Sequence, residues 1–213
     1  MPPVETEVKF HLPDPVGLRT KLLALGAHSL GRALERNVRF EDEGHNLLRN
    51  KSLLRLRRDR KSTLTYKSVP ADTDPAFKQL NELEVEVDDF DTMQRILMSL
   101  GYRPEQIYEK WRETLVMDQT HFCLDHLPFG NFLEIEGSKE AITHFSARLG
   151  LDWTRRILRN YLEIFDLIRT RHHLPFRDVT FNNFAALPFQ LDALLPLLET
   201  GPDQPPEGFR STL

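Results

Sequence analysis

The chain has 213 residues, of which 40% are hydrophobic and 28% are charged, and its formal net charge is -4. This length and composition predict one folded domain with a sizeable core and an additional tail, rather than two equal domains. Because the net charge is negative, a broad basic face is not expected, and neither is nucleic acid as a partner. Any anion-binding site must therefore be a local cluster of cations.

Targeting and membrane signals are also lacking in the sequence. Its first residues lack the cationic and apolar regions of a secretory signal, and no apolar run approaches the ~20 residues that cross a bilayer. Since Cys123 is the single cysteine, no internal disulfide can form. We therefore expect a cytoplasmic protein without a membrane partner.

Alternation of polar and apolar residues predicts most of the secondary structure. Residues 4–12 read V-E-T-E-V-K-F-H-L, which is the period-two pattern of a strand. Similar patterns predict strands over residues 29–41, 52–59, 62–69, 80–87, 102–117, 121–126 and 131–137. The sequence R-D-R-K at residues 58–61 is expected to form a hairpin turn between two of them. Many strands and few helices indicate a closed antiparallel sheet.

Four helices and a tail complete the prediction. Helices are expected over residues 14–25, 91–100, 139–149 and 152–171, the last with Asp152 as its N-cap. We assign residues 1–174 to one domain and residues 175–213 to a C-terminal extension. Within the extension, residues 184–198 are apolar enough to dock as a short helix, or to pair with a second copy of the chain. The proline-rich end from residue 202 is expected to be disordered.

Charged residues are sorted by strand in an unusual way. Five sets share one face of a strand because they are spaced by two residues. The sets are Glu5, Glu7 and Lys9; Arg55 and Arg57; Glu82, Glu84 and Glu86; Lys110 and Arg112; and Glu134 and Glu136. Any one set alone is best interpreted as a solvated face. Together they indicate a binding site, because rows of like charge repel unless an opposite charge, a metal or a ligand faces them.

Closing the sheet would bring these faces together around one lumen. Carboxylates there would hold Mg²⁺ or Mn²⁺, which prefer oxygen ligands, and Arg and Lys side chains would bind phosphate oxygens. A polyphosphate that chelates the metal would satisfy both kinds of residue. The sequence thus predicts a site for a metal-chelated polyphosphate.

The ordered motifs resemble those of the CYTH family, also called triphosphate tunnel metalloenzymes. The first is E-T-E-V-K from Glu5, which matches the family's E-x-E-x-K signature. The later motifs, in order, are L-R-L-R from residue 54, L-T-Y-K from 64, E-L-E-V-E-V-D from 82, E-K-W-R from 109, C-L-D from 123 and G-N-F-L-E-I-E-G from 130. The resemblance covers residues 4–167. It implies an α+β fold built on an eight-stranded closed antiparallel β-barrel, the triphosphate tunnel, with flanking helices.

The resemblance also implies roles for individual residues. The expected metal ligands for Mg²⁺ or Mn²⁺ are Glu5, Glu7, Asp125, Glu134 and Glu136. The expected triphosphate-binding residues are Lys9, Arg55, Arg57, Lys67, Lys110 and Arg112. Glu82, Glu84 and Glu86 are expected to line the lumen without an assigned role.

The role or direction of Lys9, Cys123 and Arg39 stays open. Lys9 would act as a catalytic base only if its neighbours lower its pKa, whereas opposed carboxylates would raise that pKa. Cys123 is expected to be a buried small hydrophobe, either in the apolar set of its strand or in the lumen. Arg39 stands where an aromatic or apolar residue is expected, so its direction is undecided. Tyr161 is expected to pack against the tunnel.

The leading function is a metal-dependent triphosphatase that hydrolyses inorganic or organic triphosphate. The alternative is a class IV adenylate cyclase, which converts ATP to cyclic AMP and pyrophosphate in the same kind of lumen. A noncatalytic polyphosphate-binding module is the third hypothesis. In each case the expected partner is a small molecule that contains a triphosphate, and a homodimer is an open alternative.

Overall fold

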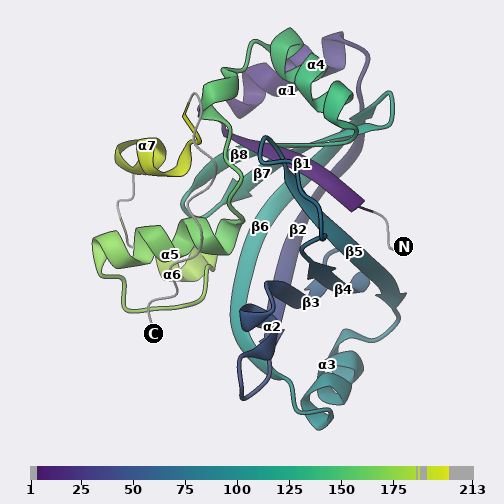
Figure 1. Ribbon diagram of the computed structural model, residues 1–213, viewed down its shortest axis with the longest axis vertical. Helices are drawn as coiled ribbons and strands as arrows, with labels where there is room; N and C mark the ends of the chain where they lie inside the picture. Colours follow the sequence, from purple (N-terminus) through teal and green to yellow (C-terminus); the bar gives the residue numbers. More distant parts are fainter. Residues whose placement is uncertain (1–3, 186, 188–190, 202–213) are drawn as a thin grey trace.

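The architecture is a ring of eight antiparallel strands with helices around it, as drawn in Figure 1. The structure is a computed structural model that describes residues 4–185, 187 and 191–201. The strand order around the ring is β1-β5-β4-β3-β2-β6-β7-β8, and pairing of β8 with β1 closes it. The bounds are β1 Val4–His11, β2 His28–Glu41, β3 Ser52–Arg58, β4 Ser62–Ser68, β5 Lys78–Val87, β6 Arg103–Met117, β7 Thr120–Leu127 and β8 Gly130–Glu136. The predicted α+β class and closed sheet are confirmed.

The ring is polar inside and apolar outside. In β1, Val8 and Phe10 are buried in a cluster that includes Leu22 of α1 (Pro15–Ala24) and Phe145 of α4 (Lys139–Leu149). The alternate residues Glu7 and Lys9 lie on the opposite face, where they form ion pairs with one another. Burial of this part of the outer face beneath α1 and α4 therefore leaves the inner face for charged groups, while Leu83 and Val85 of β5 stay exposed outside.

The helices over the ring begin and end at the residues that cap them. The Asp14 side chain accepts a hydrogen bond from the Gly17 amide at the start of α1, and Ser138 caps α4 in the same way. Helix α3 (Phe90–Ser99) packs its Phe90 and Leu97 into a separate cluster with residues of β2 and β3. A short helix α2 (Asn46–Arg49) links β2 to β3. Among the residues described here, no helix is long and apolar enough to cross a membrane.

The single helix predicted over residues 152–171 is wrong, because the chain is extended in its middle. Asp152 caps only a short 3-10 turn, η1 (Trp153–Arg155), and helix α5 (Tyr161–His172) begins at a separate capping box. Between them, Ile157 pairs with Lys9 through two backbone hydrogen bonds of 3.1 and 2.7 Å. Since β5 begins opposite Glu7, the part of β1 beyond Glu7, including Lys9, is open on that side. Residue 157 fills this opening.

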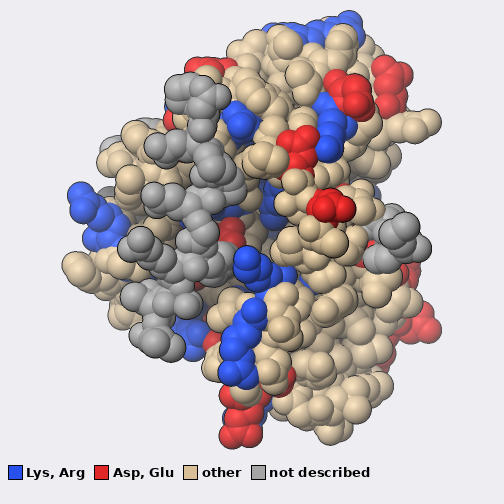
Figure 2. Space-filling view, in the orientation of Figure 1, with Lys and Arg blue, Asp and Glu red and all other residues tan. Residues whose placement is uncertain are grey.

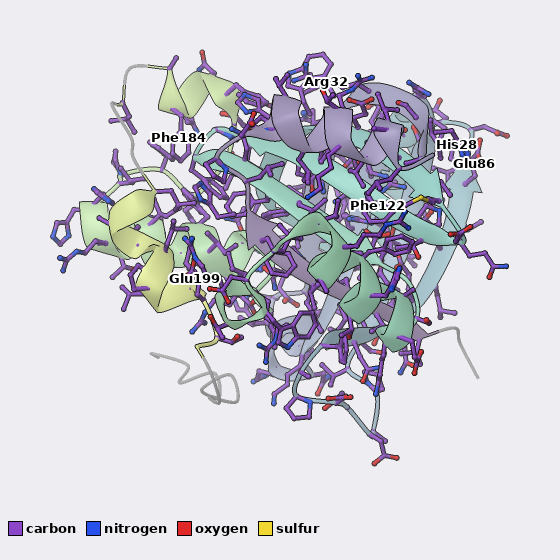
Figure 3. The ribbon with its side chains drawn as sticks, turned by 90° about the horizontal axis from the view of Figure 1, so that it is seen from above. His28, Arg32, Glu86, Phe122, Phe184 and Glu199 are labelled. Carbon is purple, nitrogen blue, oxygen red and sulfur yellow. The ribbon has the colours of Figure 1, made fainter. Side chains whose placement is uncertain are left out.

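The C-terminal segment packs against α5 and one end of the ring. The backbone of Val179 pairs with β6 beside Tyr108, where β7 no longer covers that strand. Helices α6 (Phe181–Phe184) and α7 (Leu195–Leu198), with the turn η2 (Asp192–Leu194), complete a cluster around Phe165 of α5. Figure 3 shows Phe184 on this side, well away from Phe122 on the ring. The disorder predicted from residue 202 falls outside the described residues.

Candidate functional site

An acidic group lies on the inner face where β1 meets β8. Glu7 pairs with Glu136 in the strand register, and Lys9 pairs with Glu134. Carboxylate oxygens of Glu5, Glu7 and Glu136 all lie within 4.8 Å of one another. Four of the five expected metal ligands therefore come together on two adjacent strands.

Lys9 lies inside this acidic group and is almost fully buried, with 1% exposure. Its Nζ atom is 3.0 Å from an oxygen of Glu134 and also donates to Glu7. Burial alone would lower the pKa of Lys9, but Glu134 and Glu7 outweigh it and raise that pKa. Lys9 is therefore charged at neutral pH.

Two carboxyls of this group have pKa values that shift in opposite directions. Burial would raise the pKa of Glu7, but Lys78 and Lys9 lower it below its ordinary value; Lys78 Nζ lies 2.7 Å from Glu7. Glu136 lies at 3.7 Å from Arg112, which does not offset its burial and the nearby Glu134, Glu5 and Glu7. The pKa of Glu136 rises to about 8. At neutral pH Glu136 is therefore largely protonated, while Glu7 is ionised.

A second cluster on β6 and β7 centres on Asp125. Its Oδ2 atom accepts hydrogen bonds from Lys110 at 2.9 Å and from the Tyr161 hydroxyl at 2.8 Å. Arg112 donates to both oxygens of Asp125 and also contacts Glu134. Tyr161 therefore packs against the ring, as predicted, and it also fixes a charged group.

The remaining cations project from β3 and β4. Arg57 lies 3.6 Å from Glu84, and Arg55 lies 3.9 Å from the same residue. Lys67 lies 2.9 Å from Glu82 and also contacts Glu5, so it joins β4 to the acidic group. The three glutamates of β5 share the inner face, and the last of them, Glu86, pairs with an exposed lysine at the end of the strand.

Two charged residues of the site were missed by the sequence analysis. Glu35 of β2 is buried among Lys110, Arg112 and Arg57 at 3.6 to 3.9 Å. Burial would raise its pKa, but these cations lower it to about 2. Lys78 is the other, because the predicted strand began two residues after it. Both residues could have been found from the period of two along a strand. Counting back in steps of two from Glu82 reaches Lys78, and counting back from Arg39 reaches Glu35.

The open points about Cys123 and Arg39 are also answered. Cys123 is buried on the inner face, where its sulfur lies 3.7 Å from Glu136, and burial raises the pKa of the thiol. Arg39 pairs with Arg55 in the register of β2 and β3 and so shares its inner face. Neither residue belongs to an outer apolar set.

Figure 2 shows acidic and basic side chains together inside a hollow in the middle of one face. Outside this hollow, Lys and Arg side chains are scattered rather than gathered into a broad patch. The site thus combines a group of carboxylates with several cations in a space with little water contact. This arrangement is suited to a multivalent anion that carries its own cation.

Comparisons with known proteins agree with this geometry. A family model described as the CYTH domain matches residues 4–157. The PH1012 protein from Pyrococcus horikoshii is 28% identical with a TM-score of 0.65, and the match covers 75% of this chain and 98% of that one. No curated protein sequence matches the chain.

Two further solved structures share the fold at lower identity. A Vibrio parahaemolyticus protein described as a candidate adenylate cyclase is 20% identical with a TM-score of 0.66, covering 78% of this chain and 99% of that one. A Hippeastrum protein, described as a candidate adenylyl cyclase with a dominant triphosphatase activity, is 20% identical with a TM-score of 0.57, covering 76% and 95%. At this identity the likeness concerns the fold alone.

Proposed function

Because the chain belongs to the CYTH family, we propose that it is a metal-dependent triphosphatase that hydrolyses inorganic or organic triphosphate inside the ring. The observation that carries the proposal is the meeting of Glu5, Glu7 and Glu136 on one inner wall with cations on the strands around them. A triphosphate with its metal matches both groups at once. The ring then serves as the triphosphate tunnel.

The inner carboxylates fit a hard divalent cation. Three oxygens within 4.8 Å of one another, from Glu5, Glu7 and Glu136, supply the donors that Mg²⁺ and Mn²⁺ prefer. The raised pKa of Glu136 reflects its burial and the negative charge crowded around it, and a cation would relieve this crowding. When bound, the metal would neutralise phosphate charge and lower the pKa of the attacking water. Glu134 borders this group and is a further proposed ligand.

Asp125 fits a different role from the metal ligand expected at first. Both of its oxygens already accept hydrogen bonds from Lys110, Arg112 and Tyr161. We propose that it holds the two cations in place for the substrate. In this way the long side chains lose their rotamer freedom before the substrate arrives.

The proposed substrate-binding cations remain Lys9, Arg55, Arg57, Lys67, Lys110 and Arg112. Hydrolysis of a phosphoryl group needs positioning and neutralisation of charge more than covalent chemistry from the protein. Lys9 contributes as a charged group and not as a base, because the carboxylates beside it raise its pKa. The water would therefore be deprotonated by another route.

The alternative activity is cyclisation of ATP, which the description of the Vibrio protein names. Both reactions need the same charged lumen but differ in their products. Hydrolysis releases orthophosphate, whereas cyclisation releases pyrophosphate and cyclic AMP. Product analysis therefore separates them.

The test offers tripolyphosphate, thiamine triphosphate and ATP separately, with Mg²⁺ and with Mn²⁺. We expect orthophosphate from at least one of them. Cyclic AMP with pyrophosphate would establish the cyclase instead, and binding without turnover would establish a noncatalytic module.

Two isosteric variants link the activity to the carboxylates. Glu134→Gln and Glu136→Gln should each lower turnover at saturating metal by about 100-fold or more, because each removes one charge from the proposed metal site. The far-ultraviolet circular dichroism of both variants should match that of the wild type. Wild-type rates in both would remove these residues from the site.

A further inference from the structure

Three inner residues form a row across adjacent strands β2, β3 and β4. Asn37 is paired with Arg57 in the register of β2 and β3, and Arg57 is paired with Thr63 in the register of β3 and β4. All three side chains lie on the same face of the sheet as the charged residues of the site. The row therefore joins two neutral polar groups to one of the proposed substrate-binding arginines.

The polar atoms of this row lack hydrogen-bond partners among the described residues. Asn37 has 0% exposure and both atoms of its side-chain amide are unpartnered. Thr63 has 1% exposure and its hydroxyl is unpartnered, as is the Nε atom of Arg57. Buried polar groups in folded proteins nearly always have partners. A row of three such residues side by side therefore points to a ligand.

The guanidinium in the middle of the row is also free to bind an anion. Its nearest carboxylate oxygens, on Glu84 and Asp59, lie at 3.6 Å, which exceeds the length of a hydrogen bond. In contrast, Arg112 donates directly to both oxygens of Asp125. Arg57 thus forms ion pairs with carboxylates but donates no hydrogen bond to them.

The row faces the acidic group across the ring. In the ring of eight strands, β2 lies four places from β1, and β3 lies four places from β8. The pair β2 and β3 therefore lies on the wall opposite the pair β1 and β8. A triphosphate whose metal is held by the carboxylates would extend toward this row. Its oxygens are acceptors, and the row supplies donors.

We propose that Asn37 and Thr63 are substrate-binding residues that, together with Arg57, hold one phosphoryl group of the triphosphate at the wall opposite the carboxylates. This inference rests on the proposed function. The Asn37 amide and the Thr63 hydroxyl each donate a hydrogen bond to a nonbridging oxygen, on either side of the guanidinium. Neutral donors fix the position of the phosphoryl group without adding charge to it.

The test measures binding of tripolyphosphate by isothermal titration calorimetry in EDTA, so that turnover does not interfere. The variants are Asn37→Leu and Thr63→Val, which preserve side-chain size and remove the unpartnered atoms. Each should weaken binding about tenfold, because each removes a hydrogen bond to a charged oxygen. The melting temperature of the ligand-free variants should not fall, since no internal hydrogen bond is lost. If Asn37→Leu does not fold, Asn37→Ala replaces it.

Thr120→Val is the matched control. The Thr120 hydroxyl is also buried and unpartnered, but it lies on the other face of β7, beside Gly137. This variant should bind tripolyphosphate as the wild type does. Wild-type affinity in both row variants would overturn the inference.

The proposed function is judged separately from this result. Weaker binding in the row variants, in a wild type that binds tripolyphosphate without hydrolysing it, would support the row and refute the triphosphatase. Hydrolysis by the wild type, with unchanged binding in the variants, would refute the row alone. A wild type that binds tripolyphosphate neither in EDTA nor with Mg²⁺ or Mn²⁺ would refute both.

Discussion

The two walls of the ring hold their charged side chains in different ways. On the wall formed by β1, β6, β7 and β8, ion pairs are short: Lys9 lies 3.0 Å from Glu134, and Lys110 lies 2.9 Å from Asp125. On the wall formed by β2, β3 and β4, Lys67 keeps a short pair at 2.9 Å from Glu82, but carboxylates lie 3.6 to 3.9 Å from Arg57, and polar atoms of Asn37 and Thr63 are unpartnered within the described residues.

This difference separates two physical tasks. The first wall is ordered by its own hydrogen bonds, so its geometry exists before any ligand binds. The second wall keeps donors available, which has a cost in the free protein that ligand contacts would offset. Stability should therefore depend mostly on the first wall, and substrate affinity should depend strongly on the second.

The largest expected effect is a loss of stability on the first wall. Asp125→Ala removes the carboxylate that accepts hydrogen bonds from both Lys110 and Arg112, which leaves these buried cations sharing only the more distant Glu35, at 3.6 and 3.9 Å. Breaking a buried charge cluster in this way should lower the free energy of unfolding by about 3–5 kcal/mol. Urea unfolding followed by circular dichroism measures this loss. A loss below ~1 kcal/mol would mean that water solvates these charges, and the contrast between the walls would fail.

The second prediction concerns affinity on the other wall. Arg57→Ala should weaken binding of tripolyphosphate by about 10-fold to 100-fold, because each charge-assisted hydrogen bond contributes roughly 1.5–3 kcal/mol. The affinity for orthophosphate should fall much less, since a short anion can bind elsewhere among the cations. Calorimetry with both anions tests this. Equal losses for the two would place Arg57 outside the path of the longer chain.

The third prediction sharpens the comparison through pH. The pKa of Glu136 is raised by burial and neighbouring carboxylates to about 8 in the folded protein, from an ordinary value of 4.5. The contribution of protonated Glu136 to the free energy of unfolding is therefore fully present below pH 4.5 and is lost as pH rises to about 8. The metal-free wild type should lose stability across this window, by up to ~1.4 kcal/mol per pH unit.

Glu136→Gln removes the ionisable group and should flatten this dependence. The variant should melt above the metal-free wild type at pH 8.5, and the difference should shrink as pH falls toward about 5. Differential scanning calorimetry in EDTA at several pH values measures both proteins. Parallel curves would show that Glu136 does not change its protonation in this range.

Much of the ring could be predicted because its physical signals are local. Alternation places Glu5, Glu7 and Lys9 on one face whatever the rest of the chain does, and the same holds for Glu134 and Glu136. Rows of like charge on single strands also indicated that the faces must meet something of opposite charge. Both the strands and the acidic group followed from these patterns.

The remaining parts depend on contacts between distant segments. Ile157 pairs with Lys9 because β5 stops short along β1, which the sequence around residue 157 does not encode. Glu35 lies in a strand where Arg36 interrupts the alternation of polar and apolar residues, so its inward direction was not recognised. The hydrogen bonds that Asp125 accepts from three residues form only when β6 and α5 come together in space. Periodicity cannot reveal such links.

The smallest expected effect compares two threonines on one strand. Thr65 and Thr63 are both buried on the inner face of β4. The Thr65 hydroxyl accepts from Arg55 at 3.2 Å and donates to Glu84 at 3.0 Å, whereas the Thr63 hydroxyl is unpartnered in the described part of the chain. Thr65→Val should therefore lower the free energy of unfolding by about 1 kcal/mol or more. Thr63→Val should leave it unchanged or raise it, because valine needs no hydrogen bond. Chemical denaturation of the ligand-free proteins decides between these outcomes. If both variants lose the same stability, the Thr63 hydroxyl already serves the free protein, and the second wall does not hold its donors in reserve for a ligand.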